Sequence, residues 1–205
     1  EVFPVSQDGV QSLVRKFPNY SNKITVKRLG TFSTNTISKF NRDKLYIVSC
    51  SIVRKVKRLD LLIEALAELE KKEVPYHWTH IGDGPEFQRI KKLAQNKLNM
   101  ENVHFTRFLK NQDVINWYKD NYVTVFINIS ASEGVPVSIM EAMSMQIPII
   151  ATDVGGTGEI VENNKNGFLL PENCSVHEIV DALLKLKKMS IEDYNSLRHN
   201  AFSTW

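Results

Sequence analysis

Short runs of apolar residues alternate with longer amphipathic stretches along most of this chain. The apolar runs predict strands at residues 45–51, 76–81, 103–105, 123–129, 147–152 and 167–170. Apolar residues spaced three or four apart predict helices at residues 59–72, 86–98, 113–119, from 136 to before Pro148, 176–189 and 190–205. Such regular alternation is typical of an α/β fold: a three-layer, Rossmann-like parallel sheet with helices on both faces.

The run at residues 123–129 is the strongest of these signals. Its apolar residues are too continuous for a half-exposed strand and too few for a helix, so we expect a strand covered on both faces. The loop that follows leads to Pro136, and proline suits a first helical turn because its missing N–H has no partner there.

Two strand–loop–helix units in succession place two helix N-termini at the carboxyl edge of the sheet. Their loops, residues 130–136 and 153–158, both contain glycine, which lets a phosphate approach the backbone. Free N–H groups and the helix dipole favour an anion there. Glu133 and Glu141 would repel a phosphate, so we expect them to meet hydroxyl groups beside it. A ligand with phosphates flanked by polyols is a nucleotide-sugar.

This stretch resembles a known family, the retaining glycosyltransferases of family 4. The matching residues are Glu133, Gly134, Pro136, Glu141, Ala142, Met143, Pro148, Ala151, Thr152, Asp153, Gly155, Gly156, Glu159, Ile160 and Val161. For an isolated pair of glutamates, ordinary surface charges would be the better interpretation, but the whole string favours a binding site. The resemblance implies the donor-binding, C-terminal half of a GT-B fold.

The implied reaction moves a hexosyl group from a nucleotide diphosphate sugar to an acceptor hydroxyl, with retention at the anomeric carbon. No metal ion or other cofactor is expected. The acceptor would be a saccharide or a lipid-linked molecule, and the setting bacterial surface polysaccharide or glycolipid synthesis. The missing N-terminal domain of the same protein would be the essential partner.

The resemblance also assigns roles to residues of this chain. Glu133 and Lys57 are the expected catalytic residues. The expected donor-binding residues are Glu141, Arg58, Ser51, Gly134, Val135, Pro136, Val137, Arg107 and Phe108. Glu141 would hold ribose hydroxyls, Glu133 the transferred sugar, and Lys57 with Arg58 the leaving diphosphate.

Two positions depart from the family pattern. Ile52 stands where the family places an arginine on the diphosphate, and Arg54 or Arg58 would have to replace it. Arg107 stands where the family has a glycine in the loop that holds the nucleotide base. The base pocket is therefore expected to differ.

Residues 1–41 are expected to be a remnant of the acceptor-side domain with its linker, and residues 42–205 the donor-binding domain. The chain starts at Glu1, and residues 3–6 resemble the end of a longer strand, so we expect a fragment. Residues 8–17 predict a short helix capped by Asp8, residues 24–29 a strand, and residues 30–43 a polar connector.

The composition of the chain limits the kinds of partner that it is expected to bind. A net charge of +3 is too small to indicate nucleic acid, although it leaves room for peripheral contact with an anionic membrane. The two cysteines and five histidines show no metal-type spacing. No apolar run reaches the ~18 residues of a membrane span. A cytoplasmic location is expected.

Three other classes of protein have to be compared with this pattern. A dinucleotide oxidoreductase needs Gly-x-Gly-x-x-Gly after the first strand, and residues 51–58 contain no glycine. A nucleotide-sugar epimerase or hydrolase of related fold, and a non-catalytic nucleotide-sugar-binding module, remain alternatives.

Overall fold

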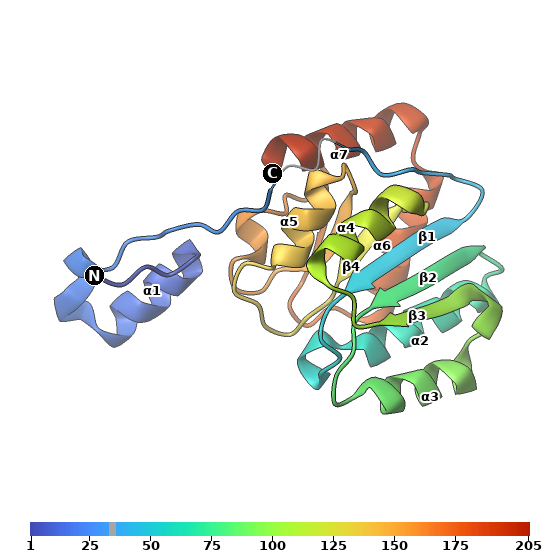
Figure 1. The fold of residues 1–205 in the computed structure, drawn as a ribbon, viewed down its shortest axis with the longest axis horizontal. Helices are drawn as coiled ribbons and strands as arrows, with labels where there is room; N and C mark the ends of the chain where they lie inside the picture. The colour runs from blue at the N-terminus through green and yellow to red at the C-terminus, as the bar shows by residue number, and fades with distance from the viewer. Residues whose placement is uncertain (33–35) are drawn as a thin grey trace.

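The computed structural model describes residues 1–32 and 36–205. Six parallel strands form one sheet in the order β3-β2-β1-β4-β5-β6 (Figure 1). The strands are β1 (Leu45–Cys50), β2 (Tyr76–Ile81), β3 (Val103–Arg107), β4 (Val125–Asn128), β5 (Ile149–Thr152) and β6 (Gly167–Leu170). All six predicted strands of the main domain are present.

Helices cover both faces of the sheet. They are α2 (Leu59–Lys71), α3 (Phe87–Lys97), α4 (Asn111–Asp120), α5 (Val137–Ser144), α6 (Val176–Lys188) and α7 (Ile191–Thr204). One core joins the sheet to α2, α3 and α6, with Leu66 and Trp78 fully buried in it. The other joins the sheet to α4, α5 and α7 around Phe126 and Ile139. The three-layer prediction is confirmed.

The order of the strands reverses direction between β1 and β4. From β1 the chain moves outward to β2 and β3, then returns to place β4 on the other side of β1, with Ile47 opposite Val125. Loops leaving the carboxyl ends of β1 and β4 diverge at this switch point. Open α/β sheets bind ligands in the crevice that results.

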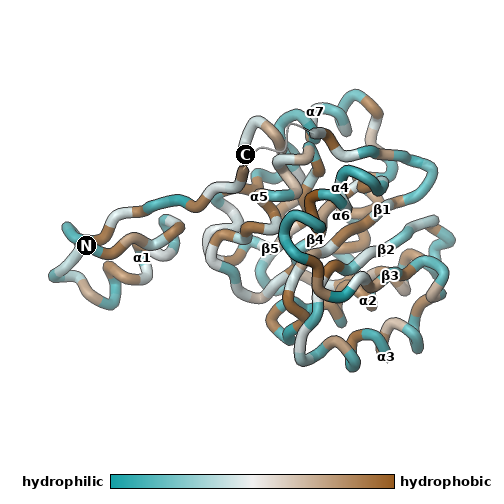
Figure 2. The backbone as a smooth tube through the Cα atoms, viewed as in Figure 1, coloured by the Kyte–Doolittle hydropathy of each residue, from teal (hydrophilic) through white to brown (hydrophobic). Residues whose placement is uncertain are grey.

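The hydropathy of the residues varies with their position in the three layers of the fold. Figure 2 shows hydrophobic residues concentrated along the strands and hydrophilic residues on the outer helices and loops. β4 and β5 are covered on both sides, and only Asn128 at the end of β4 is partly exposed. Burial on both faces explains why their sequences are apolar runs rather than alternating patterns.

The first 28 residues, called here the N-terminal segment, differ from the sequence prediction. Helix α1 (Gln7–Lys16) is capped by Ser6, whose Oγ accepts from the N–H of Gly9 at 3.0 Å. Asp8 lies in the first turn, so the predicted cap is wrong. The chain must adopt an extended backbone at a cap, and Ser6 does so. A short 3₁₀ helix, η1 (Pro18–Lys23), follows.

The predicted strand at residues 24–29 does not form. Thr25 and Lys27 donate backbone hydrogen bonds to Val2 and Pro4, and this pairing amounts to one isolated bridge between Val2 and Ile24. Two short segments paired only with each other are marginally stable as strands.

The N-terminal segment lies to one side of the main body and is joined to it by an extended connector (Figure 1). Residues 33–35 of the predicted connector lie outside the described residues. Beyond them the connector runs along the body, where Ser38 N–H donates to Met145 O at 3.0 Å. Among the described helices, none has the length and apolar character needed to cross a bilayer.

Candidate functional site

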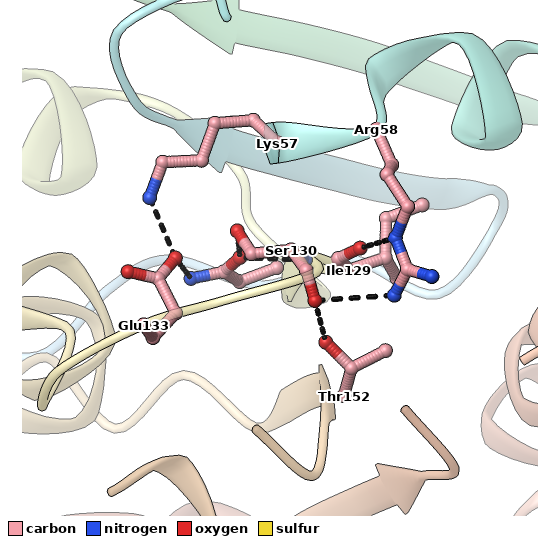
Figure 3. Close-up of polar contacts among 7 residues, drawn as sticks. Lys57, Arg58, Ile129, Ser130, Glu133 and Thr152 are labelled. Atoms are coloured by element: carbon pink, nitrogen blue, oxygen red, sulfur yellow. Dashed lines mark hydrogen bonds and ion pairs between the residues drawn. The ribbon is translucent and has the colours of Figure 1, made fainter. Parts of the chain in front are cut away.

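A partly buried ion pair marks the switch point of the sheet. Lys57 ends a 3₁₀ turn, η2 (Lys55–Lys57), after β1, and Glu133 lies in the loop after β4. Lys57 Nζ lies 2.6 Å from Glu133 Oε1, and Asn128 Nδ2 donates to the same oxygen at 3.0 Å (Figure 3). The side chains are 17% and 11% exposed, respectively. The structure therefore brings together the two expected catalytic residues.

The environment of Glu133 keeps its carboxylate ionised. Burial alone would raise its pKa, but hydrogen bonds from Lys57, Ser130 and Asn128, together with the charge of Lys57, lower the pKa overall. An anionic ligand that binds Lys57 would therefore compete with Glu133 for the ammonium group. Glu133 would then need new hydrogen-bond donors, because a half-buried carboxylate without partners is costly.

Arg58 is engaged elsewhere, although it is adjacent to Lys57 in sequence. Its Nε donates to Ile129 O at 2.7 Å and its Nη2 to Ser130 O at 3.1 Å. Figure 3 shows Lys57 reaching toward Glu133 while Arg58 turns toward the end of β4. Arg58 has a left-handed backbone with φ of 47°, which separates the directions of the two side chains. In this structure the guanidinium of Arg58 binds backbone carbonyl groups just after β4. Its contact with a diphosphate stays a prediction.

The two glycine loops, residues 130–136 and 153–158, are joined directly. Gly156 N–H donates to Gly134 O at 2.7 Å. Gly155 has φ of +54°, and a Cβ there would lie 1.9 Å from Glu133 O, so no other residue fits. After the first loop, Pro136 precedes α5, and no side chain caps this helix N-terminus. Gly134, Val135, Pro136 and Val137 thus border the same edge as Glu133.

Glu141 occupies a separate part of the edge. It is buried in α5 and accepts a short hydrogen bond from Asn111 Nδ2 at the start of α4. Burial raises the pKa of Glu141, and the Asn111 hydrogen bond opposes that rise. Both residues line a cavity of about 500 Å³ between α4, α5 and the connector. Asn111 belongs to no motif of the sequence, and its only signal is its place at the start of a helix, just after the Arg107–Phe108 loop.

The end of β3 accommodates one departure from the family pattern. Arg107 has φ of 66°, a conformation in which glycine is ordinarily favoured. Its guanidinium lies 4.2 Å from the Phe87 ring and 2.7 Å from Asp83 Oδ2, contacts that offset the backbone strain. The next residue, Phe108, is 72% exposed.

Ser51 and Ile52 lie where β1 meets the turn after β2. Ser51 N–H donates to Ile81 O at 3.0 Å. A Cβ on Gly82 would lie 1.9 Å from Ser51 O, and one on Gly84 would lie 2.6 Å from Val53 O. The two glycines let this turn pack against the loop that carries Lys57. Ile52 is half exposed and Arg54 exposed, and the replacement of the absent arginine by Arg54 or Arg58 stays a prediction.

The described residues offer no evident metal-binding site. Within residues 1–32 and 36–205, no three His, Cys, Asp or Glu side chains are grouped to hold a metal ion. A metal-independent site remains a prediction.

Comparison with known proteins points to one family. The model of glycosyl transferases group 1 matches residues 33–204. The chain is 30% identical over 174 residues to the GtfA subunit of UDP-N-acetylglucosamine–peptide N-acetylglucosaminyltransferase from Streptococcus agalactiae, covering 81% of this chain and 33% of that protein. It is 34% identical over 138 residues to the O-antigen biosynthesis glycosyltransferase WbnH of Escherichia coli, covering 67% and 36%. The chain thus spans about a third of the length of these relatives.

Solved structures share the fold. The crystal structure of TarM matches with a TM-score of 0.84 at 23% identity, covering 99% of this chain and 39% of that one. The structure of Anabaena Alr3699/HepE in complex with UDP-glucose matches with a TM-score of 0.81 at 18% identity, covering 98% and 57%.

Proposed function

This chain belongs to the family of glycosyl transferases group 1, and from that premise we propose that it is the nucleotide-sugar-binding domain of a retaining GT-B glycosyltransferase of family 4. The enzyme transfers a hexosyl group from a nucleoside diphosphate sugar to an acceptor hydroxyl. The observation that carries this proposal is the ion pair between Lys57 and Glu133 at the switch point, beside the two joined glycine loops.

The charges of Lys57 and Glu133 indicate which kind of ligand this site would bind. A ligand that opens it must offer an anion to Lys57 and hydroxyl donors to Glu133, close together. A sugar diphosphate has both features. As the bond between sugar and diphosphate breaks, negative charge grows on the leaving phosphate, and the fixed ammonium of Lys57 stabilises it. In this scheme Lys57 supplies the positive charge and no metal is required.

The rest of the donor is accommodated along the same edge. Ribose hydroxyls donate to Glu141, which Asn111 already holds in place beside the cavity. Arg107 and Phe108 border the base, and the backbone of Gly134–Val137 borders the sugar. The solved HepE complex contains UDP-glucose, which makes uridine diphosphate (UDP) the first nucleotide to test.

The acceptor belongs to the part of the enzyme beyond this domain. We propose a saccharide or lipid-linked acceptor in surface polysaccharide or glycolipid synthesis, in line with the O-antigen role in the name of the WbnH relative. A cytoplasmic, membrane-peripheral location accompanies that proposal. The N-terminal segment and connector would be the end of the acceptor-side domain.

Calorimetric titration tests the proposal. The chain is expected to bind UDP, and Lys57→Met should weaken UDP binding about tenfold to a hundredfold, because a charge-assisted contact contributes roughly 1.5 to 3 kcal/mol. Methionine keeps much of the lysine's apolar stem. Uridine, which has no phosphate, should bind both proteins equally.

Lys55→Met is the matched control, since Lys55 is an exposed lysine in the same 3₁₀ turn. Equal losses for UDP and uridine, or equal losses from both substitutions, would remove the diphosphate role of Lys57. Absence of binding to any nucleoside diphosphate would refute the donor site.

A further inference from the structure

The N-terminal segment packs directly on the two glycine loops. Ser6 is 4% exposed, and its Cβ lies 2.7 Å from the position of a Cβ built on Gly156. Val5 Cγ2 lies 3.8 Å from the corresponding position on Gly134. The residues just before α1 therefore cover the loops that border Glu133, and any side chain on Gly156 would push them away.

One carboxylate contacts this segment at two places, the start of α1 and the end of the segment. Glu159 lies in a 3₁₀ turn, η4 (Thr157–Glu159), that follows the second glycine loop. Its Oε1 accepts from Asp8 N–H at 3.1 Å, at the start of α1. Its Oε2 lies 2.7 Å from Arg28 Nη1, where the segment passes into the connector. A residue beside the site thus contacts the first turn of the helix and the end of the segment.

The surroundings of Glu159 favour its charged form. Burial acts to raise its pKa, but N–H groups of Gln7 and Asp8 and the guanidinium of Arg28 lower the pKa overall. A carboxylate at a helix N-terminus also interacts favourably with the helix dipole. The side chain is 18% exposed, so these contacts are partly shielded from water.

We infer that Glu159 is a positioning residue that holds the N-terminal segment against the glycine loops as the second wall of the donor site. The inference rests on the proposed function, because it assigns the loops to a donor. Without this contact α1 would be weakly stabilised, because none of its residues is buried and an isolated helix of its length is marginal in water. The N-terminal segment would then unfold locally and expose the donor site to solvent.

Amide hydrogen exchange of α1 and UDP affinity together test the inference. Glu159→Gln removes the charge with little change in size. Exchange in α1 should become roughly fivefold to thirtyfold faster, because glutamine loses the charge but keeps an oxygen that accepts hydrogen bonds, and UDP binding should weaken severalfold. Glu162→Gln is the control, because Glu162 pairs locally with Lys165 at 2.8 Å, and it should change neither measurement.

A second pair of variants probes the other contact. Arg28→Ala should also accelerate exchange in α1, whereas Arg28→Lys, which keeps the charge, should restore most of the protection. If Arg28 only stabilised the protein in general, the change in exchange and its recovery in Arg28→Lys would not be limited to α1.

The outcomes separate the two proposals. Unchanged exchange in Glu159→Gln, or equal acceleration by Glu162→Gln, overturns the anchoring role even if UDP binds well. Faster exchange with unchanged UDP affinity shows that the segment is anchored but is no wall of the site, which also overturns the inference. If the unmodified chain binds no nucleoside diphosphate, the proposed function fails, and the inference about a donor wall fails with it.

Discussion

Two glutamates close together in the sequence have opposite environments. Lysine and amide donors lower the pKa of Glu133, whereas burial raises the pKa of Glu141. Glu133 faces the ion pair at the switch point, and Glu141 faces Asn111 beside a cavity. One loop and helix therefore present a strongly paired carboxylate and a weakly paired one, suited to different parts of one ligand.

Glu141→Gln should distinguish ribonucleotides from deoxyribonucleotides. Glutamine retains an oxygen for Asn111 but loses the charge that accepts from ribose hydroxyls, so UDP binding should weaken about tenfold. The 2′-deoxy analogue should lose less, since it has one hydroxyl fewer. Titration of both nucleotides measures the difference, and equal weakening would exclude the ribose role.

His80 should make the stability of the domain fall in mild acid. It is fully buried, its Nδ1 lies 2.9 Å from Ser49 Oγ, and burial lowers its pKa to about 4. An unfolded histidine has a pKa near 6.5. Between these values the unfolded state binds more protons, so stability is lost as pH falls through this window, by up to about 3 kcal/mol.

Urea unfolding at several pH values measures this dependence. His80→Gln should be less stable at neutral pH yet show a shallower fall toward pH 4, while the exposed His199→Gln should follow the unmodified chain. Identical pH profiles for all three proteins would show that His80 does not couple folding to protonation.

The sequence indicated some site residues and not others, for a physical reason. Lys57, Glu133 and Glu141 belong to short motifs at strand ends, and parallel topology alone brings strand ends together. The partner of Glu141, Asn111, comes from another helix, and the contacts of Glu159 come from a segment far away in sequence. Such pairings depend on how elements pack, which a local pattern does not contain.

At the scale of elements, buried strands were the most predictable. The run at 167–170 matches β6 in full, and the runs at 123–129 and 147–152 contain β4 and β5, whose burial on both faces demands continuous apolar residues. Helix starts were less predictable, since either Ser6 or Asp8 was suited to cap α1. The alternation at 24–29 was misleading, because a strand also needs a sheet to join.

The end of α2 has an unusual residue at a position that favours glycine. Val74 N–H donates to Leu69 O and Glu73 N–H to Glu70 O, the hydrogen-bond pattern of a Schellman motif. Glu73 therefore has φ of 54°, although it is not glycine.

Glu73→Gly should stabilise the domain by about 0.5 to 1 kcal/mol, because relief of left-handed strain exceeds the added entropy of the unfolded chain. Thermal and urea unfolding would measure the gain. Glu73→Ala removes the same carboxylate without relieving the strain, so it should give no gain. Equal effects of the two substitutions would attribute the change to charge.

At the scale of the whole molecule, every proposed donor contact comes from one sheet edge and the segment beside it. The chain spans about a third of its relatives' length. We therefore expect it to bind UDP and its sugars without transferring sugar, because orientation and exclusion of water contribute several kcal/mol of barrier lowering. A product assay beside the titration checks this expectation, and measurable transfer by these 205 residues would contradict it.

The switch point also has a consequence for how the chain folds. Ile47 and Val125 pair across it although they are about eighty residues apart, so closing that loop costs more entropy than pairing β1 with β2. Local units should form early and this central pairing late, which makes it a slow step. Lys57 follows β1 and Glu133 follows β4, so the two residues lie on opposite sides of this strand pairing. The ligand site is then completed only when the two halves of the sheet dock, and a ligand that bridges them retards their separation.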